Sequence, residues 1–255
     1  MPKLNLNKTV IAILLTLGTA NFAASMGVAD TSVTMQEALN ASIRGEDSDR
    51  DESRKPAETL AFFEVKNTST VLEITPGRGW YTKILGTYLK ESGKLYVSVR
   101  ADVQRLKLEE NGLQHVVLLE QSNELQRTDI PTLFDASNVD FGVTDVDVAL
   151  TFRNVHNLTV GARAEINKGV FRALKPGGVY GIVGHTKRHM EKYDEERWRR
   201  TDPVQIIKEV LAAGFIFEDF SDLHARPNDD LIFDTTDDSI EGDSDRFTLK
   251  FRKPK

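Results

Sequence analysis

The sequence predicts an α/β protein built on a doubly wound, mostly parallel β-sheet, and three observations support this fold class. From Ala57 onward, short apolar runs rich in Val, Leu and Ile alternate with amphipathic stretches, as in strand–helix units. A glycine-containing segment at residues 75–79 follows the first of these runs. The last two apolar runs have no helix pattern between them, which predicts one antiparallel pair near the C-terminus.

Seven strands are predicted from the apolar runs. Most of them are short and rich in branched side chains, as expected for strands that are covered on both faces. The predicted strands span residues 70–74, 94–99, 115–119, 146–152, 179–184, 215–220 and 246–250.

Three helices are predicted between these strands. Residues 80–89 follow the glycine segment, and residues 161–174 repeat small and apolar side chains at a 3.6-residue period until the LKPGG sequence ends the helix with a turn. A third helix begins after Asp202, which can cap it, with Pro203 in the first helical position. Gly214 stands where a left-handed residue ends a helix.

The N-terminal residues 1–29 are typical of an export signal. Lys3 and Lys8 precede an apolar run that is too short to span a bilayer, and small residues follow. Cleavage after Ala29 or Ser25 fits the preference for small residues near the cut. A retained N-terminal anchor is the alternative. Both interpretations place the body outside the cytoplasm, periplasmic or secreted, and cleavage would leave no stable membrane anchor.

The remaining chain is predicted to contain an arm and one main domain. Residues 30–56 are polar and charged without a sustained apolar period, so we expect an N-terminal arm or lid with a short helix near residues 35–43. Residues 57–255 carry the strand–helix pattern and form the main domain.

Charge and composition exclude several classes of function. The net charge is -6, and removal of Lys3 and Lys8 with the leader would move it to -8. An acidic body of this kind is unsuited to nucleic acid, because phosphate binding needs clustered Lys and Arg. The chain has no cysteine, which excludes disulfides, thiolate catalysis and zinc sites with Cys ligands.

The glycine segment is the first candidate binding site. Ligands of open parallel sheets bind beyond the carboxyl ends of the strands, where Glu73, Thr75, Pro76, Gly77 and Gly79 lie. Glycines let a ligand approach the backbone, and the N-terminus of the following helix favours a carboxylate or phosphate. Glu73 can accept a hydrogen bond from an ammonium or hydroxyl group. A ligand with an amine and a carboxylate fits this arrangement, whereas a tight turn without a ligand is the alternative.

The same segment resembles the first motif of the class I S-adenosylmethionine-dependent methyltransferases, in which three alternating glycines follow an acidic residue. Here the motif reads EITPGRG, and Thr75 stands at the first glycine position. The acidic start of the strand at residues 146–152, the LKPGG turn and the reversed last strand agree with that family. The resemblance covers roughly residues 44–254 and implies a Rossmann-like sheet, S-adenosylmethionine as cofactor, and methyl transfer to a small molecule.

A narrower resemblance concerns the segments RDESRKP, PGRGWYT, FRNVH and DRFTLKFRKP. Together they are similar to an exported group of predicted bacterial methyltransferases. One feature departs from the larger family, whose second strand ends in an acidic residue that holds the ribose. In this chain that strand ends at Val99 and Arg100 follows, so either Asp102 reaches back to the ribose or another group holds it.

The segment after the strand at residues 146–152 is the candidate catalytic site. The resemblance implies that it faces the transferred methyl group, with Arg153, Asn154 and His156 contacting the substrate. His156 can act as a base because the usual pKa of histidine is near neutrality, and Arg153 can hold an anionic substrate. Alternatively, His156 only precedes the next helix and Arg153 pairs with an acid such as Asp147.

Other chemistries are less well supported by the sequence. His185 and His156 are expected at the same edge, but two histidines without placed carboxylates do not predict a metal site. The acidic segment before the last strand lacks the spacing of a calcium loop. A nicotinamide dehydrogenase would need a third glycine where Thr82 stands. The main alternative to an enzyme is an exported ligand-binding protein that keeps the fold without catalysis, which Arg100 in place of the ribose acid favours.

The export signal can be tested on the protein made in its native host. We expect the mature chain to lack about 25 to 29 residues, because signal peptides are removed at the small-residue site. Intact-mass measurement of the purified protein reports the N-terminus directly. A cytoplasmic product that keeps Met1 would show the prediction to be wrong.

Overall fold

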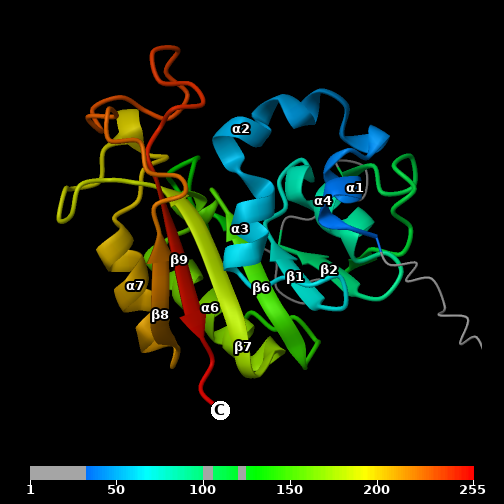
Figure 1. Cartoon of the computed structure of the whole chain (residues 1–255). Coiled ribbons are helices and arrows are strands. Elements are labelled where there is room, and N and C mark those ends of the chain that lie inside the picture. The colour runs from blue at the N-terminus through cyan, green and yellow to red at the C-terminus, as the bar shows by residue number, and fades with distance from the viewer. Residues whose placement is uncertain (1–32, 100–105, 120–124) are drawn as a thin grey trace, which may run out of the picture. The chain divides into compact units, whose positions relative to one another are not determined.

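The predicted fold class is confirmed by a computed structural model, which describes residues 33–99, 106–119 and 125–255. Residues 1–29, predicted to be an export signal, and the predicted ribose contact Asp102 lie outside the described residues. Seven strands form one sheet in the order β3-β2-β1-β6-β7-β9-β8 (Figure 1). The parallel strands are β1 (Thr70–Ile74), β2 (Lys94–Ser98), β3 (Val117–Leu118), β6 (Val146–Phe152) and β7 (Leu174–His185).

The C-terminal end of the sheet contains the predicted antiparallel pair. Strand β9 (Arg246–Arg252) pairs antiparallel with both β7 and β8 (Ile216–Ser221). The connecting segment between β8 and β9 holds turns and no helix, so the chain reverses instead of crossing over. A separate two-stranded sheet, β4 (Gln126–Arg127) with β5 (Phe134–Asp135), was not anticipated.

Helices cover both faces of the seven-stranded sheet. Two of them, α6 (Val160–Ala173) and α7 (Pro203–Ala212), pack on one face. The other face carries α1 (Met35–Leu39), α3 (Pro56–Phe62) and α4 (Trp80–Tyr88). The remaining short elements are α2 (Asp51–Arg54) and the 3-10 helices η1 (Ser42–Arg50), η2 (Val155–Asn157) and η3 (Glu195–Arg197).

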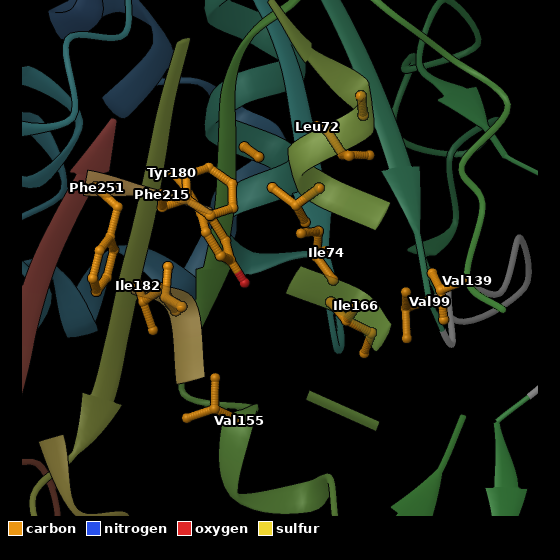
Figure 2. Packing of buried hydrophobic residues seen from close by; sticks show 14 of the residues in the cluster. Leu72, Ile74, Val99, Val139, Val155, Ile166, Tyr180, Ile182, Phe215 and Phe251 are labelled. Carbon is orange, nitrogen blue, oxygen red and sulfur yellow. The ribbon is translucent and has the colours of Figure 1, made fainter. Parts of the chain in front are cut away.

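The central strands supply side chains to two hydrophobic cores in alternation. In β1, Leu72 and Ile74 face the core under α6 and α7, whereas Val71 faces the core under α4. Figure 2 shows part of the first core, where Tyr180 of β7 lies near Phe215 and Phe251 from the C-terminal strands. This burial on both faces is the reason that the strands read as continuous apolar runs.

The predicted cap of α7 is confirmed, but β7 begins earlier than predicted. Asp202 caps α7 by accepting a hydrogen bond from the Val204 amide at 2.9 Å, with Pro203 in the first position. The LKPGG sequence, expected to be a turn, already belongs to β7. Its backbone bonds to the end of the chain, with Gly177 donating to the Lys253 carbonyl at 2.9 Å. A long-range pairing of this kind leaves no local sequence signal.

The N-terminal segment is more helical than its composition predicts. Beyond α1, it continues through η1 and α2 into α3 (Figure 1). Asp47 of η1 accepts hydrogen bonds at 2.7 Å through its carbonyl from Trp80 and through its carboxylate from Lys83, both of α4. Arg44 pairs with Asp51 at 2.8 Å inside the segment. These tertiary contacts stabilise the short helices in place of an apolar face, so the sequence shows no apolar period that would predict them.

A buried histidine joins this segment to the C-terminal strands. The Nε2 atom of His224 lies 2.9 Å from the Arg54 carbonyl, and Nδ1 lies 2.7 Å from the Thr248 hydroxyl. A carbonyl only accepts, so Nε2 carries the proton and Nδ1 accepts from Thr248. Burial lowers the pKa of His224 to about 4, so the ring is neutral near pH 7.

The packing of α3 against the sheet can be tested at Gly181 of β7. A Cβ at this position would lie 2.6 Å from the ring of Phe63, so Gly181→Ala is expected to destabilise the fold by about 1–3 kcal/mol through overpacking. Urea unfolding followed by circular dichroism measures the loss. Gly161→Ala in α6 is the matched control, because its Cβ would meet no atom closer than 3.4 Å. Equal stability of the two variants would contradict this packing.

Candidate functional site

The carboxyl ends of β1, β6 and β7 open into a cleft of about 1020 Å³. Its lining includes the loop after β1, the loop after β6 and the first residue of β9. Residues 49, 50 and 52–55 of the N-terminal segment and residues 235, 236 and 241–244 before β9 also line it. Both of these segments lie at the top of the view in Figure 1, at the same end of the sheet. The cleft therefore stands where open parallel sheets bind ligands.

The glycine segment contains strained backbone at Thr75 and open space at Gly77. Thr75, Gly77 and Gly79 all have left-handed backbone angles, with φ values of 54°, 63° and 78°. A β-branched residue such as Thr75 rarely adopts this conformation, and such strain is typical of functional sites. A Cβ added to Gly77 would meet no atom within 4 Å, so a ligand can approach the backbone there.

Hydrogen bonds hold Thr75 in its strained conformation. Its amide donates to the Ser98 carbonyl at 2.9 Å, and its hydroxyl lies 3.1 Å from that of Thr151. Its carbonyl accepts from the side-chain amide of Asn154 at 2.7 Å. Asn154 also donates to the Phe152 carbonyl at 3.0 Å and accepts from Asn157. Asn154, predicted to contact substrate, lines the cleft and joins the two strand-end loops.

Glu73 is a buried carboxyl group at the edge of the cleft. It is 2% exposed, and its Oε2 atom accepts a hydrogen bond from the Thr82 hydroxyl at 2.6 Å. Burial raises the pKa of Glu73 to about 7, which the Thr82 hydrogen bond partly opposes. A cationic ligand beside it would favour the ionised form.

The three residues predicted to be catalytic all line the cleft. His156 is buried in η2, with its ring centroid 5.2 Å from that of Trp198, and its Nδ1 has no partner among the described residues. Burial, with the nearby Arg199 and Arg153, lowers the pKa of His156 to about 3. The ring is therefore neutral near pH 7 and is a weak base. As the alternative interpretation expected, His156 lies just before the next helix, α6. It does not cap that helix, because Thr159 does.

Arg153 follows β6 and has a left-handed backbone, with φ of 54°. Burial and the nearby Arg246 lower its pKa to about 10. Asp147 does not pair with it, because that carboxylate accepts from the Thr70 amide at 2.7 Å and bonds to Lys175 at the other end of β6.

The other predicted contacts differ in position. Pro76 and Gly77 line the cleft, whereas Gly79 caps α4, where a Cβ would lie 3.0 Å from Leu106. The sequence interpretation missed Arg246, which also lines the cleft, as does Arg54 of the predicted arm or lid. For Arg246 a signal existed, because a strand antiparallel to β7 begins at the carboxyl end of β7.

Within residues 33–99, 106–119 and 125–255, no three His, Asp or Glu side chains group closely enough to hold a metal ion. The rings of His156 and His185 have centroids 6.2 Å apart. In the same described ranges, no helix has both the length and the apolar character to cross a bilayer.

Comparison with solved structures identifies relatives in fold. An S-adenosylmethionine-dependent methyltransferase from Aquifex aeolicus superposes with a TM-score of 0.55 at 18% identity, covering 87% of this chain and 99% of that chain. The 1,6-didemethyltoxoflavin-N1-methyltransferase of Burkholderia thailandensis, solved with its substrate and S-adenosylhomocysteine, gives a TM-score of 0.55 at 15% identity, covering 87% of each chain. These superpositions establish a shared Rossmann-like fold.

The same fold also supports other chemistry. The [4+2]-cyclase SpnF gives a TM-score of 0.51 at 16% identity, covering 79% of this chain and 80% of that chain. No protein-family model and no curated protein sequence matches this chain. Function must therefore be argued from the cleft.

The raised pKa of Glu73 predicts how the stability of the ligand-free protein depends on pH. Its folded-state pKa of about 7 lies above the usual value of 4.5. Protonated Glu73 therefore makes its full contribution to folding stability below pH 4.5, and this contribution is lost as the pH rises through 7. Glu73→Gln is expected to lack this decline, with a gap on the order of 3 kcal/mol by pH 8. Thermal unfolding between pH 4.5 and pH 8 measures it.

The control is Glu58→Gln, which removes the same charge from an exposed position of α3. It is expected to follow the wild-type curve. If Glu73→Gln also runs parallel to the wild type over this pH range, Glu73 is not protonated in the free protein.

Proposed function

We propose that this protein binds S-adenosylmethionine and transfers its methyl group to a small molecule. The observation that carries the proposal is the open backbone at Gly77, in the same cleft as the buried carboxyl group of Glu73. Supporting it are the resemblance of the glycine segment to the first methyltransferase motif and the fold shared with methyltransferases.

The residues of the cleft fit the amino-acid end of this cofactor. Gly77 leaves room for a carboxylate against the backbone at the N-terminal end of α4. Glu73, once ionised, accepts hydrogen bonds from an ammonium group, and Thr82 holds its carboxylate in place. When bound, S-adenosylmethionine supplies an activated methyl group on a sulfonium. The ribose contact proposed for Asp102 belongs to the part of the chain that is not described.

The protein's contribution to catalysis is then mainly alignment. Methyl transfer is an in-line displacement, so a rate gain comes from holding the acceptor atom at the right distance and angle. Asn154 fixes the loop after β6 against the loop after β1, which positions Arg153 and His156. Neutral His156 is suited to orient the acceptor through a hydrogen bond, since its low pKa makes it a poor proton acceptor.

The proposal includes export of the mature protein, as its leader predicts. An exported enzyme would depend on a supply of cofactor outside the cytoplasm. A ligand-binding protein that keeps the fold without catalysis would not depend on this supply. Cofactor binding is therefore the decisive measurement.

Calorimetry with S-adenosylmethionine and S-adenosylhomocysteine tests the proposal on the folded protein. We expect wild-type protein to bind both, and Gly77→Val to weaken binding at least tenfold because its side chain would occupy the open backbone cradle. Gly112→Val is the matched control, since Gly112 has a similar φ of 66°, has equally open surroundings and lies outside the cleft lining. Absence of heat with folded wild-type protein would rule against the enzyme.

A further inference from the structure

Arg54, Arg153 and Arg246 are three of the arginines that line the cleft, and they come from three different parts of the chain. Arg54 ends α2, Arg153 follows β6, and Arg246 begins β9. Arg54 is 7% exposed and Arg246 is 5% exposed. Burial of a cation is unfavourable unless an anion or several hydrogen bonds compensate it.

No carboxylate of the described residues forms an ion pair with any of these three arginines. Other arginines with little exposure among the described residues have carboxylate partners. Arg200 contacts both oxygens of Asp229 at 2.9 and 3.0 Å, and Arg163 contacts both oxygens of Glu209 at 2.6 and 2.8 Å. Arg54, Arg153 and Arg246 differ from these in having no carboxylate partner in the described part of the chain.

Arg246 and Arg54 each have a buried donor atom without a partner among the described residues. Arg246 donates to the carbonyls of Ser53 at 2.8 Å and Gly242 at 3.0 Å, but its Nε has no partner among the described residues. The Nη1 atom of Arg54 is buried and unpartnered within the same ranges, and its guanidinium stacks on Trp80, 4.4 Å from the ring centroid. These contacts orient the planar groups without neutralising them.

The three charges also lie close enough to repel one another. Burial and then Arg153 lower the pKa of Arg54 to about 8, and burial and then Arg246 lower the pKa of Arg153 to about 10. An anion placed between them would relieve both effects.

We infer that Arg54, Arg153 and Arg246 form a binding site for an oxyanion group with at least two negative charges, a phosphate or two neighbouring carboxylates, on the methyl acceptor. Guanidinium groups match such oxyanions with paired hydrogen bonds. Three cations require more than one negative charge for compensation. The aromatic rings of Tyr81 and Phe152, stacked 3.6 Å apart, line the same cleft beside the arginines. Only the identity of this anion as the acceptor rests on the proposed function.

The site is tested by calorimetry with pyrophosphate and with citrate, at constant ionic strength set with sodium chloride. We expect folded wild-type protein to bind at least one of them, and the anion that binds more tightly distinguishes a phosphate from a carboxylate ligand. Arg153→Met and Arg54→Met are each expected to weaken binding at least tenfold. Neither should lower the Tm of the ligand-free protein, because each removes a repelled charge that has no described ionic partner.

The control is Arg127→Met, which removes an exposed arginine outside the cleft lining and should bind the anion as the wild type does. Failure of folded wild-type protein to bind either anion, or equal weakening by the control, would overturn the site.

A competition experiment separates this site from that of the cofactor. Saturating pyrophosphate or citrate, whichever binds, should change the Kd of S-adenosylhomocysteine less than threefold. Displacement would show that the arginines hold the cofactor carboxylate and would overturn their assignment to the acceptor. If the anion binds and S-adenosylhomocysteine does not, the oxyanion site stands while the proposed methyl transfer fails.

Discussion

The hydrogen bond from the Asn154 side chain to the Thr75 carbonyl, at 2.7 Å, fixes the geometry on which the cleft depends. It joins the loop after β1 to the loop after β6, the two segments that carry the open backbone and Arg153. Thr75 has a left-handed backbone that a β-branched residue does not favour, and strain of about 1–3 kcal/mol persists only where the surroundings enforce it. The neighbouring strands supply that enforcement through Ser98 and Thr151.

The cleft brings a buried carboxyl group and arginines without carboxylate partners into one site. Glu73, near the end of β1, tends to be protonated, whereas the guanidinium groups of Arg54, Arg153 and Arg246 have no ion-pair partner among the described residues. Burial disfavours the charged form of each of these groups, and a ligand of the opposite charge would stabilise that form. Such a cleft favours a ligand pair that brings an ammonium to one side and an oxyanion to the other.

The sequence predicts the sheet well because its strands are buried on both faces and read as apolar runs. The bounds of β6 agree with the prediction residue for residue, and the antiparallel β9 follows from the absence of a crossover helix. The N-terminal helices are not predictable in this way, since hydrogen bonds to distant residues such as Trp80 hold them.

The site was predictable where its residues follow a recognisable strand. Arg153, Asn154 and His156 directly follow a recognisable strand, so their place at the cleft could be predicted. The protonation of His156 and the structural bonds of Asn154 could not, because both depend on neighbours far apart in the chain. The contacts of Arg54 could not be predicted, because they involve Trp80, which lies far along the chain.

The His224 ring has a consequence for the stability of the cleft walls. It receives and gives hydrogen bonds between α2 and β9, and separating these segments would leave a buried carbonyl and imidazole without partners, at about 1–3 kcal/mol for each group. The turns before β9 are joined to α2 as well, because Arg226 and Arg246 both donate to the Ser53 carbonyl, at 3.4 and 2.8 Å. Because these bonds link both walls of the cleft, we expect one wall to open only when its bonds to the other break.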